Sequence, residues 1–199
     1  MALDLPSLAV TNAGAWRNWL DANHARSLGV WLLLAKQGTT DPTRLTYDQA
    51  LEEALSYGWI DGQIRRGDDN TYSRRFTPRS ARSRWSKRNI SIIERLMNEG
   101  RMHPAGLAEV ERARADGRWG SAYAGSNTID VPADFAAALA ADPRAQATFE
   151  TLTRQNRYSV LYRIDTAKRS DTRARRIQQF VEMLARGETI HPQGRTPTQ

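Results

Sequence analysis

The chain contains no cysteine, which removes several classes of site at once. Without a thiol it has no disulfide bond, no thiolate nucleophile and no cysteine-ligated metal centre. Histidine is almost as scarce, and His24, His103 and His191 lie far apart in the sequence with no metal-ligand spacing such as HxxxH. We therefore expect neither a metal site nor a bound cofactor.

Long apolar runs and the common catalytic motifs are also missing. No run reaches the roughly 18 apolar residues of a membrane-spanning helix, and the N-terminus lacks the basic start and apolar middle of a secretory signal. We therefore expect a cytoplasmic protein. The motifs GxxxxGK(S/T), GxGxxG and GxSxG do not occur, so nucleotide hydrolysis, dinucleotide binding and the usual serine hydrolase site have no support.

Positive charge is plentiful and unevenly distributed. The net charge is +7, but residues 61–90 carry nine Lys/Arg against three acids and residues 154–176 carry eight against two. Each segment is therefore +6, and the rest of the chain is −5. Two concentrated basic segments on a mildly acidic remainder indicate attraction of an anionic partner. The alternative is that both segments are solvated helix faces with intramolecular ion pairs.

The N-terminal part alternates between helical and strand patterns. An amphipathic helix is expected over residues 11–23, followed by a short apolar run at residues 30–35 that predicts a central strand buried on both faces. Thr46 and Gln49 form a capping-box pattern that begins a second helix, which ends at Gly58. Residues 59–65 and 71–77 then predict a β-hairpin around a Gly-Asp-Asp-Asn loop.

The hairpin brings together the candidate pocket residues, if its turn is centred on Asp68 and Asp69. Period-two alternation then places six side chains on one face, and a one-residue slip would break this grouping: Asp61, Gln63, Arg65, Tyr72, Arg74 and Phe76. We expect Asp61 to form a structural ion pair with Arg74 or another arginine rather than to act as a general base.

A basic connector follows the hairpin and leads to a helix that begins at Ser86. The N-terminus of a helix offers free N–H groups and a partial positive charge to an anion such as phosphate. Trp85, a further pocket candidate, is expected to pack in the core rather than to stack on a base. The candidate anion-binding residues of this segment are Arg79, Arg82, Arg84, Ser86, Lys87 and Arg88.

The second half of the chain predicts helices only. A helix from Pro104 to Gly117 is followed by helix starts at Pro132, Asp142-Pro143 and Ser170. A second basic cluster surrounds the last of these starts, and its anion-binding candidates are Lys168, Arg169, Arg173 and Arg176. Here the solvated-face alternative is stronger, because positions away from the apolar stripe at Ile177 should be polar.

The fold class that follows is α+β. We expect a small antiparallel sheet, made of the central strand and the hairpin and packed by helices, followed by an all-helical C-terminal half. The expected organisation is an N-terminal domain over residues 1–118, a linker loop over 119–131, a helical domain over 132–188 and a mobile tail over 189–199.

Four motifs in order carry a family resemblance: ALSYGWIDG, RRFTPRSARSRWSKRN, EGRMHPAGLAEVERA and NRYSVLYRIDTAKRSDTRARRI. Over about residues 12–188 the chain resembles the YdeI/OmpD-associated (OmdA-like, bacteriocin-protection) family. The resemblance implies a small soluble bacterial protein of the stress or antimicrobial-resistance type, or one associated with an outer-membrane porin. It implies no catalytic residues.

Three functions remain open. The charge distribution favours a non-enzymatic protein that binds a polyanion, such as nucleic acid, through a basic face. The resemblance favours an adaptor that acts through a protein partner in envelope or bacteriocin stress. An enzyme with an Asp/Arg/Tyr pocket on the hairpin is the third alternative, and it rests on Asp61 and its neighbours alone.

Overall fold

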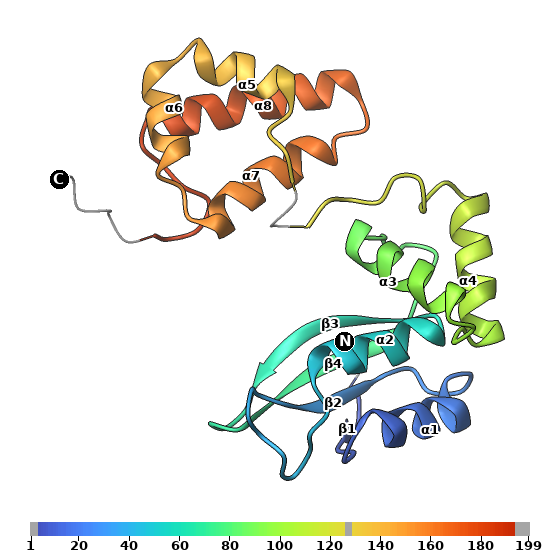
Figure 1. Ribbon diagram of the computed structural model, residues 1–199. Helices are drawn as coiled ribbons and strands as arrows, with labels where there is room; N and C mark the ends of the chain where they lie inside the picture. The colour runs from blue at the N-terminus through green and yellow to red at the C-terminus, as the bar shows by residue number, and fades with distance from the viewer. Residues whose placement is uncertain (1–3, 126–128, 194–199) are drawn as a thin grey trace. The chain divides into compact units, whose positions relative to one another are not determined.

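The computed structural model describes residues 4–125 and 129–193. The chain forms two compact units, Met1–Ala122 and Tyr123–Gln199, which we call unit 1 and unit 2 and treat separately (Figure 1). Part of the predicted linker, residues 126–128, and part of the predicted mobile tail, residues 194–199, lie outside the described residues.

Unit 1 contains a four-stranded sheet (Figure 1). Its strands are β1 (Ser7–Leu8), β2 (Val30–Ala35), β3 (Trp59–Arg66) and β4 (Thr71–Pro78). The order is β1-β2-β4-β3, with β1 parallel to β2 and the other pairs antiparallel. The predicted central strand and hairpin are therefore confirmed, and β1 is an addition that is too short to show a period in the sequence.

The helices of unit 1 begin where side chains cap them. They are α1 (Ala13–Asn23), α2 (Tyr47–Ser56), α3 (Lys87–Asn98) and α4 (Pro104–Ala115). Each is preceded by a residue whose side chain accepts a hydrogen bond from a backbone N–H of the first turn: Asn12, Thr46, Ser86 and His103. The predicted capping box of Thr46 and Gln49 is present in full.

Two apolar clusters hold unit 1 together. Trp16 of α1 and Ala50 of α2 belong to a cluster with Leu32 and Phe76, so α1 and α2 cover one face of the sheet (Figure 1). A second cluster joins α2, α3 and α4 around Trp85, which is only 1% exposed. The expectation that Trp85 packs in the core is thus confirmed.

The other face of β2 differs from the expectation that this strand is buried on both sides. Val30, Leu32 and Leu34 are buried, whereas Trp31 and Leu33 between them are only half-buried. The run is apolar on both faces, so hydropathy hides the alternation that the fold imposes. One face of the sheet therefore carries apolar and aromatic side chains that remain partly open to solvent.

The hairpin register corrects the predicted grouping of pocket residues. Asp61 pairs with Phe76, but the ladder then shifts and Ile64 pairs with Arg74. Arg65 is consequently opposite Ser73, on the face away from Arg74, and the prediction that it shares a face with the other pocket residues is wrong. The reason is an irregularity between Asp61 and Ile64, because one extra residue in a strand reverses the alternation beyond it.

Unit 2 is helical, as predicted for the C-terminal half. It contains α5 (Ala133–Ala140), α6 (Pro143–Glu150), α7 (Arg154–Asp165) and α8 (Ser170–Ala185). Its core includes Phe135, Phe149, Leu161 and Phe180, one from each helix. The α+β fold class is confirmed. Among the described residues no helix has the length and apolar character that crossing a membrane requires.

The segment that follows α8 is held against α7. The Asn156 side chain, 1% exposed, donates to the His191 carbonyl at 2.9 Å and accepts from the His191 backbone N–H at 2.8 Å. The Ser159 hydroxyl lies 2.9 Å from Nε2 of the same histidine. These bonds fix the described part of the predicted tail, residues 189–193, to the helical unit.

Candidate functional site

The half-buried face of the sheet in unit 1 brings an indole and two guanidinium groups together. We call this surface the open face, and it is formed by Trp31, Leu33, Arg65, Ser73 and Arg75. Trp31 is directly opposite Arg75 in the ladder of β2 and β4, and Arg65 is opposite Ser73 in the ladder of β3 and β4. The four strands contain one acidic residue, Asp61, and its register places it on the helix-covered face beside Phe76.

The geometry of the open face is that of a cation stacked on an aromatic ring. The guanidinium carbon of Arg65 lies 4.2 Å from the centroid of the Trp31 ring. Arg75 lies against Gly62, where a Cβ atom would be 3.1 Å from the arginine Nε. Within residues 4–125 and 129–193 neither Arg65 nor Arg75 forms an ion pair, and the buried Nε of Arg75 has no hydrogen-bond partner. The positive charge of this face is therefore not neutralised by an internal acid.

An aromatic ring flanked by unneutralised arginines suits a ligand with both flat rings and anionic groups. Base rings stack on indole without regard to sequence, and guanidinium groups donate paired hydrogen bonds to phosphate. Leu33 and Ser73 continue the same face with an apolar side chain and a hydroxyl. The open face therefore combines the two kinds of contact that single-stranded nucleic acids use.

On the opposite face the candidate pocket residues form a closed polar network. Oδ2 of Asp61 lies 2.5 Å from Nη2 of Arg74 and accepts a hydrogen bond from the Tyr47 hydroxyl at 3.0 Å. The Arg74 guanidinium also stacks on the Tyr47 ring at 4.2 Å. Burial, and then the charge of Asp61, raise the pKa of Tyr47 to about 12.

The predicted ion pair between Asp61 and Arg74 is thus present. The pKa of Tyr72, on the same face of the sheet, is raised by burial. The side chains of Arg74 and Asp61 are 20% and 14% exposed, and Asp61 is engaged by both a guanidinium and a hydroxyl. This network connects the hairpin to α2. The Asp61 carboxylate, which the enzyme alternative would use as its general base, is occupied by Arg74 and Tyr47.

In the connector the structure divides the predicted anion-binding residues into two groups. Arg79 is 7% exposed, lies 3.6 Å above the Trp85 ring and donates to the Arg84 carbonyl at 3.1 Å, so it holds the connector to the core. Ser86 caps α3 by accepting from the Asn89 N–H at 3.1 Å.

The remaining connector candidates, Arg82, Arg84, Lys87 and Arg88, are exposed. Arg88 is paired with Asp48 at 2.6 Å. Arg82 and Lys87 form no ion pair within the part of the chain that the structure describes. An anion-binding role of the connector stays a prediction, and it now depends on Arg82 and Lys87 more than on the others.

The second basic cluster has internal roles in unit 2. Arg173 binds Asp134 through two bonds of 2.6 and 2.9 Å and donates to the Ile164 carbonyl at 3.1 Å. Arg176 donates to the Arg163 carbonyl. These carbonyls belong to the last turn of α7, where arginine side chains satisfy groups that the helix leaves unbonded.

The other members of this cluster are exposed. Arg169 pairs with Asp171 at 2.7 Å, and Lys168 forms no ion pair among the described residues. The alternative of a charged helix face with internal partners therefore describes most of the second cluster. In this cluster fewer positive charges remain available to an external anion than the sequence alone indicates.

A cluster that the sequence analysis missed lies beside α4. The ring centroids of Tyr57 and His103 are 4.5 Å apart, and those of His24 and His103 are 4.7 Å apart. The two histidine Nδ1 atoms are engaged, because His24 donates to the Leu20 carbonyl at 2.9 Å and His103 accepts from the Ala105 N–H at 3.1 Å. Burial and the charge of His24 lower the pKa of His103.

Tyr57 and His103 line a cleft of about 330 Å³. Arg17 and Arg101 line it too, but both bind the buried carboxylate of Glu53, at 2.6 and 3.2 Å. No local signal could have revealed this cluster, because its residues are far apart in the sequence. Within the described residues no group of three or more His, Asp or Glu is arranged to hold a metal ion.

Comparison with protein families divides the chain at the same place as its fold. Residues 8–109, just over half of the 199 residues, match the family described as "Domain of unknown function (DUF8412)". The chain belongs to this family. Residues 128–187 match a second family, described as "Bacteriocin-protection, YdeI or OmpD-Associated".

The two matches refine the resemblance that the sequence motifs carried. The resemblance to the YdeI/OmpD-associated family is confirmed, and its match is confined to unit 2. The DUF8412 match covers the open face, the polar network of Asp61 and the connector, all of which lie in unit 1. Comparisons with curated proteins and with solved structures found no match.

Proposed function

We propose that unit 1 binds a phosphate-rich, single-stranded polyanion, such as nucleic acid, across the open face. The observation that supports this most strongly is the stack of Arg65 on Trp31 with Arg75 directly opposite, on a sheet face to which the strands contribute no acid. The indole provides a platform for a base, and the two guanidinium groups contact the phosphates on either side.

A single strand fits this surface better than a duplex. Trp31 is half-buried in the sheet with the Arg65 guanidinium over its ring, and a flat aromatic side chain of this kind stacks on bases that are already unstacked and does not reach base edges within a groove. β4 ends at Pro78, three residues beyond Arg75 or about 10 Å at the usual rise of a strand, and the connector that follows offers Arg82 and Lys87 to further phosphates.

The family of unit 2 supports a second candidate function. The match of unit 2 to the YdeI/OmpD-associated family suggests a stress protein, and the description of that family names bacteriocin protection and association with OmpD. An adaptor that acts through a protein partner would fit this description. The two candidates differ in one measurable respect, because only the first requires binding of a polyanion to unit 1.

The proposal is tested by replacing Trp31 with alanine. Stacking of one base on an aromatic side chain contributes about 1–3 kcal/mol, so affinity for a labelled single-stranded oligonucleotide should fall roughly 5- to 150-fold. Trp31→Phe retains a ring and should recover part of the loss. Fluorescence anisotropy at low salt measures both variants against the wild type.

The duplex of the same sequence provides the comparison. We expect the wild type to bind it more weakly than the single strand, and Trp31→Ala to change duplex binding little. Wild type that binds neither form at low salt would remove the polyanion proposal and favour the adaptor. Equal affinities of the wild type and Trp31→Ala would show that any binding occurs elsewhere.

A further inference from the structure

The indole that the proposed function uses as a stacking platform is covered by an arginine in this structure. The guanidinium carbon of Arg65 lies 4.2 Å from the centroid of the Trp31 ring, which is contact distance for a stacked cation. A base and a guanidinium cannot occupy the same side of an indole. Whatever holds Arg65 on the ring therefore also controls the access of a base to that side.

Arg65 reaches the ring across a neighbouring strand. β4 lies between β3 and β2, and the β4 residue opposite Arg65 is Ser73, whose small side chain leaves room for the arginine to cross. Arg65 is exposed. Within residues 4–125 and 129–193 its guanidinium forms no hydrogen bond and no ion pair, so the stack on Trp31 is the contact that holds it.

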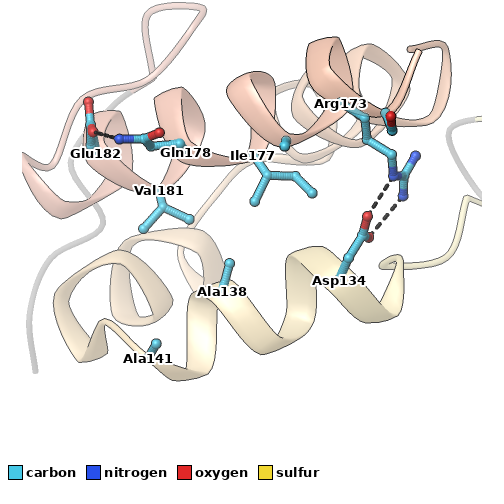
Figure 2. Close-up of a pocket in the computed structure, with 10 residues that line it drawn as sticks. Asp134, Ala138, Ala141, Arg173, Ile177, Gln178, Val181 and Glu182 are labelled. Carbon is cyan, nitrogen blue, oxygen red and sulfur yellow. Dashed lines mark hydrogen bonds and ion pairs between the residues drawn. The ribbon is translucent and has the colours of Figure 1, made fainter. Parts of the chain in front are cut away.

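No acid of the sheet neutralises Arg65. The strands contribute one carboxylate, Asp61, which lies on the helix-covered face and is bound by Arg74. Arg173 in unit 2 provides the contrast, because two bonds to Asp134 fix its guanidinium and neutralise its charge beside the groove between α5 and α8 (Figure 2). Arg65 has no such partner and remains available to an anion from outside the chain.

The contact that retains Arg65 is weaker than the contacts that a phosphate offers. A cation on an aromatic ring at an exposed site contributes about 2- to 5-fold to an equilibrium constant, whereas a hydrogen bond to a charged group contributes about 10- to 150-fold. A guanidinium that leaves the ring for a phosphate exchanges a weak contact for a stronger one. A guanidinium that an uncharged ring displaces loses its contact and gains none.

We propose that Arg65 makes the stacking of a base on Trp31 conditional on a phosphate. When a strand binds, the guanidinium moves from the ring to a phosphate, and a base takes its place on the indole. This inference rests on the proposed function and specifies its ligand. The open face selects strands that carry a phosphate beside the stacked base, and it discriminates against uncharged aromatic groups.

The test compares two labelled single strands of one base sequence by fluorescence anisotropy at low salt. One strand has the natural phosphodiester backbone. The other has a methylphosphonate backbone, which keeps the bases and sugars but carries no charge. Arg65→Ala uncovers the ring, so it should bind the neutral strand about 2- to 5-fold more tightly than the wild type does. It should bind the phosphodiester strand roughly 2- to 75-fold more weakly, because the lost phosphate contact outweighs the uncovered ring.

Arg75→Ala is the comparison on the same face. Arg75 lies against Gly62 and not over the indole. Its loss should weaken binding of the phosphodiester strand without strengthening binding of the neutral strand. Circular dichroism establishes that both variants keep the fold. An equal gain for the neutral strand in Arg65→Ala and Arg75→Ala would overturn the inference, because the gain would then not depend on uncovering the ring.

Two other results would overturn this inference alone, provided that binding of the phosphodiester strand depends on Trp31. One is a neutral strand that Arg65→Ala binds no better than the wild type, up to millimolar concentrations. The other is a neutral strand that Arg65→Ala binds more weakly, which would show that bases stack on the guanidinium itself. Wild type that binds neither strand would overturn the proposed function and this inference with it.

Discussion

Replacement of Asp61 by asparagine tests the polar network that fastens the hairpin to α2. The variant keeps the shape of the side chain but removes its charge, so the Arg74 guanidinium loses its carboxylate partner while remaining mostly buried. Breaking a fully buried ion pair costs about 3–5 kcal/mol, and an exposed pair contributes about 0–1 kcal/mol. Because the two side chains are 14% and 20% exposed and asparagine can still accept from Tyr47, we expect a loss of about 2 kcal/mol.

The assay can follow unit 1 alone. All six tryptophans of the chain lie in unit 1, so tryptophan fluorescence reports its unfolding without a contribution from unit 2. For a unit of this size a loss of about 2 kcal/mol corresponds to a fall in Tm of roughly 6–10 °C. Urea unfolding should show the same loss with an unchanged dependence on denaturant.

Asp48→Asn is the control for this prediction. Asp48 pairs with Arg88 at 2.6 Å, but its side chain is 74% exposed, so the same substitution should cost less than about 1 kcal/mol. Equal stabilities of the Asp61→Asn and Asp48→Asn variants would refute the argument that burial makes the Asp61 pair important. Retained stability with loss of a measurable turnover would instead return attention to the enzyme alternative.

Two further predictions concern α4 and the cluster beside it. Because burial and His24 lower the pKa of His103, the unfolded chain takes up a proton on this residue at higher pH than the folded chain. The free energy of unfolding should therefore fall as the pH drops below about 6.5. It should fall less in His103→Asn, because asparagine can still cap α4 but does not titrate. Urea unfolding at several pH values measures the difference between the two proteins, and parallel pH profiles would contradict the prediction. Gly106→Ala should destabilise unit 1 by about 2 kcal/mol or more, because its Cβ would lie 2.1 Å from the Ser56 carbonyl oxygen; unchanged urea unfolding of unit 1 would contradict this.

Local signals made most element boundaries predictable. Helix starts are marked by residues that deal with the unbonded N–H groups of the first turn. Side chains of the capping box at Thr46 and Gln49 and of the cap at Ser86 accept hydrogen bonds from such groups, and Pro104 has no N–H to leave unbonded. The ion pair of Asp61 with Arg74 was also accessible, because neighbouring strands of a hairpin bring such residues close together.

The open face was not predictable, for two physical reasons. The irregularity beside Gly62 moves Arg65 to the other side of the sheet; an isolated glycine in a strand suggests a bulge, but it does not specify at which residue the register shifts. The apolar run around Trp31 is compatible with burial on either face, so only the packing of α1 and α2 decides which face stays open.

In the second basic cluster, charge alone could not distinguish arginines that cap α7 from arginines that are free to bind a ligand.

The most direct test of the proposed function is the salt dependence of binding to a single strand by Arg65→Ala/Arg75→Ala. Each phosphate contact on a single strand contributes about 0.7 to the slope of log affinity against log salt, so loss of both arginines should flatten the slope by about 1.4. Arg157→Ala is the control, because Arg157 is an exposed arginine stacked on Phe149 at 4.4 Å in unit 2, and it should keep the wild-type slope. A double variant with the wild-type slope would contradict the assignment of phosphate binding to the open face.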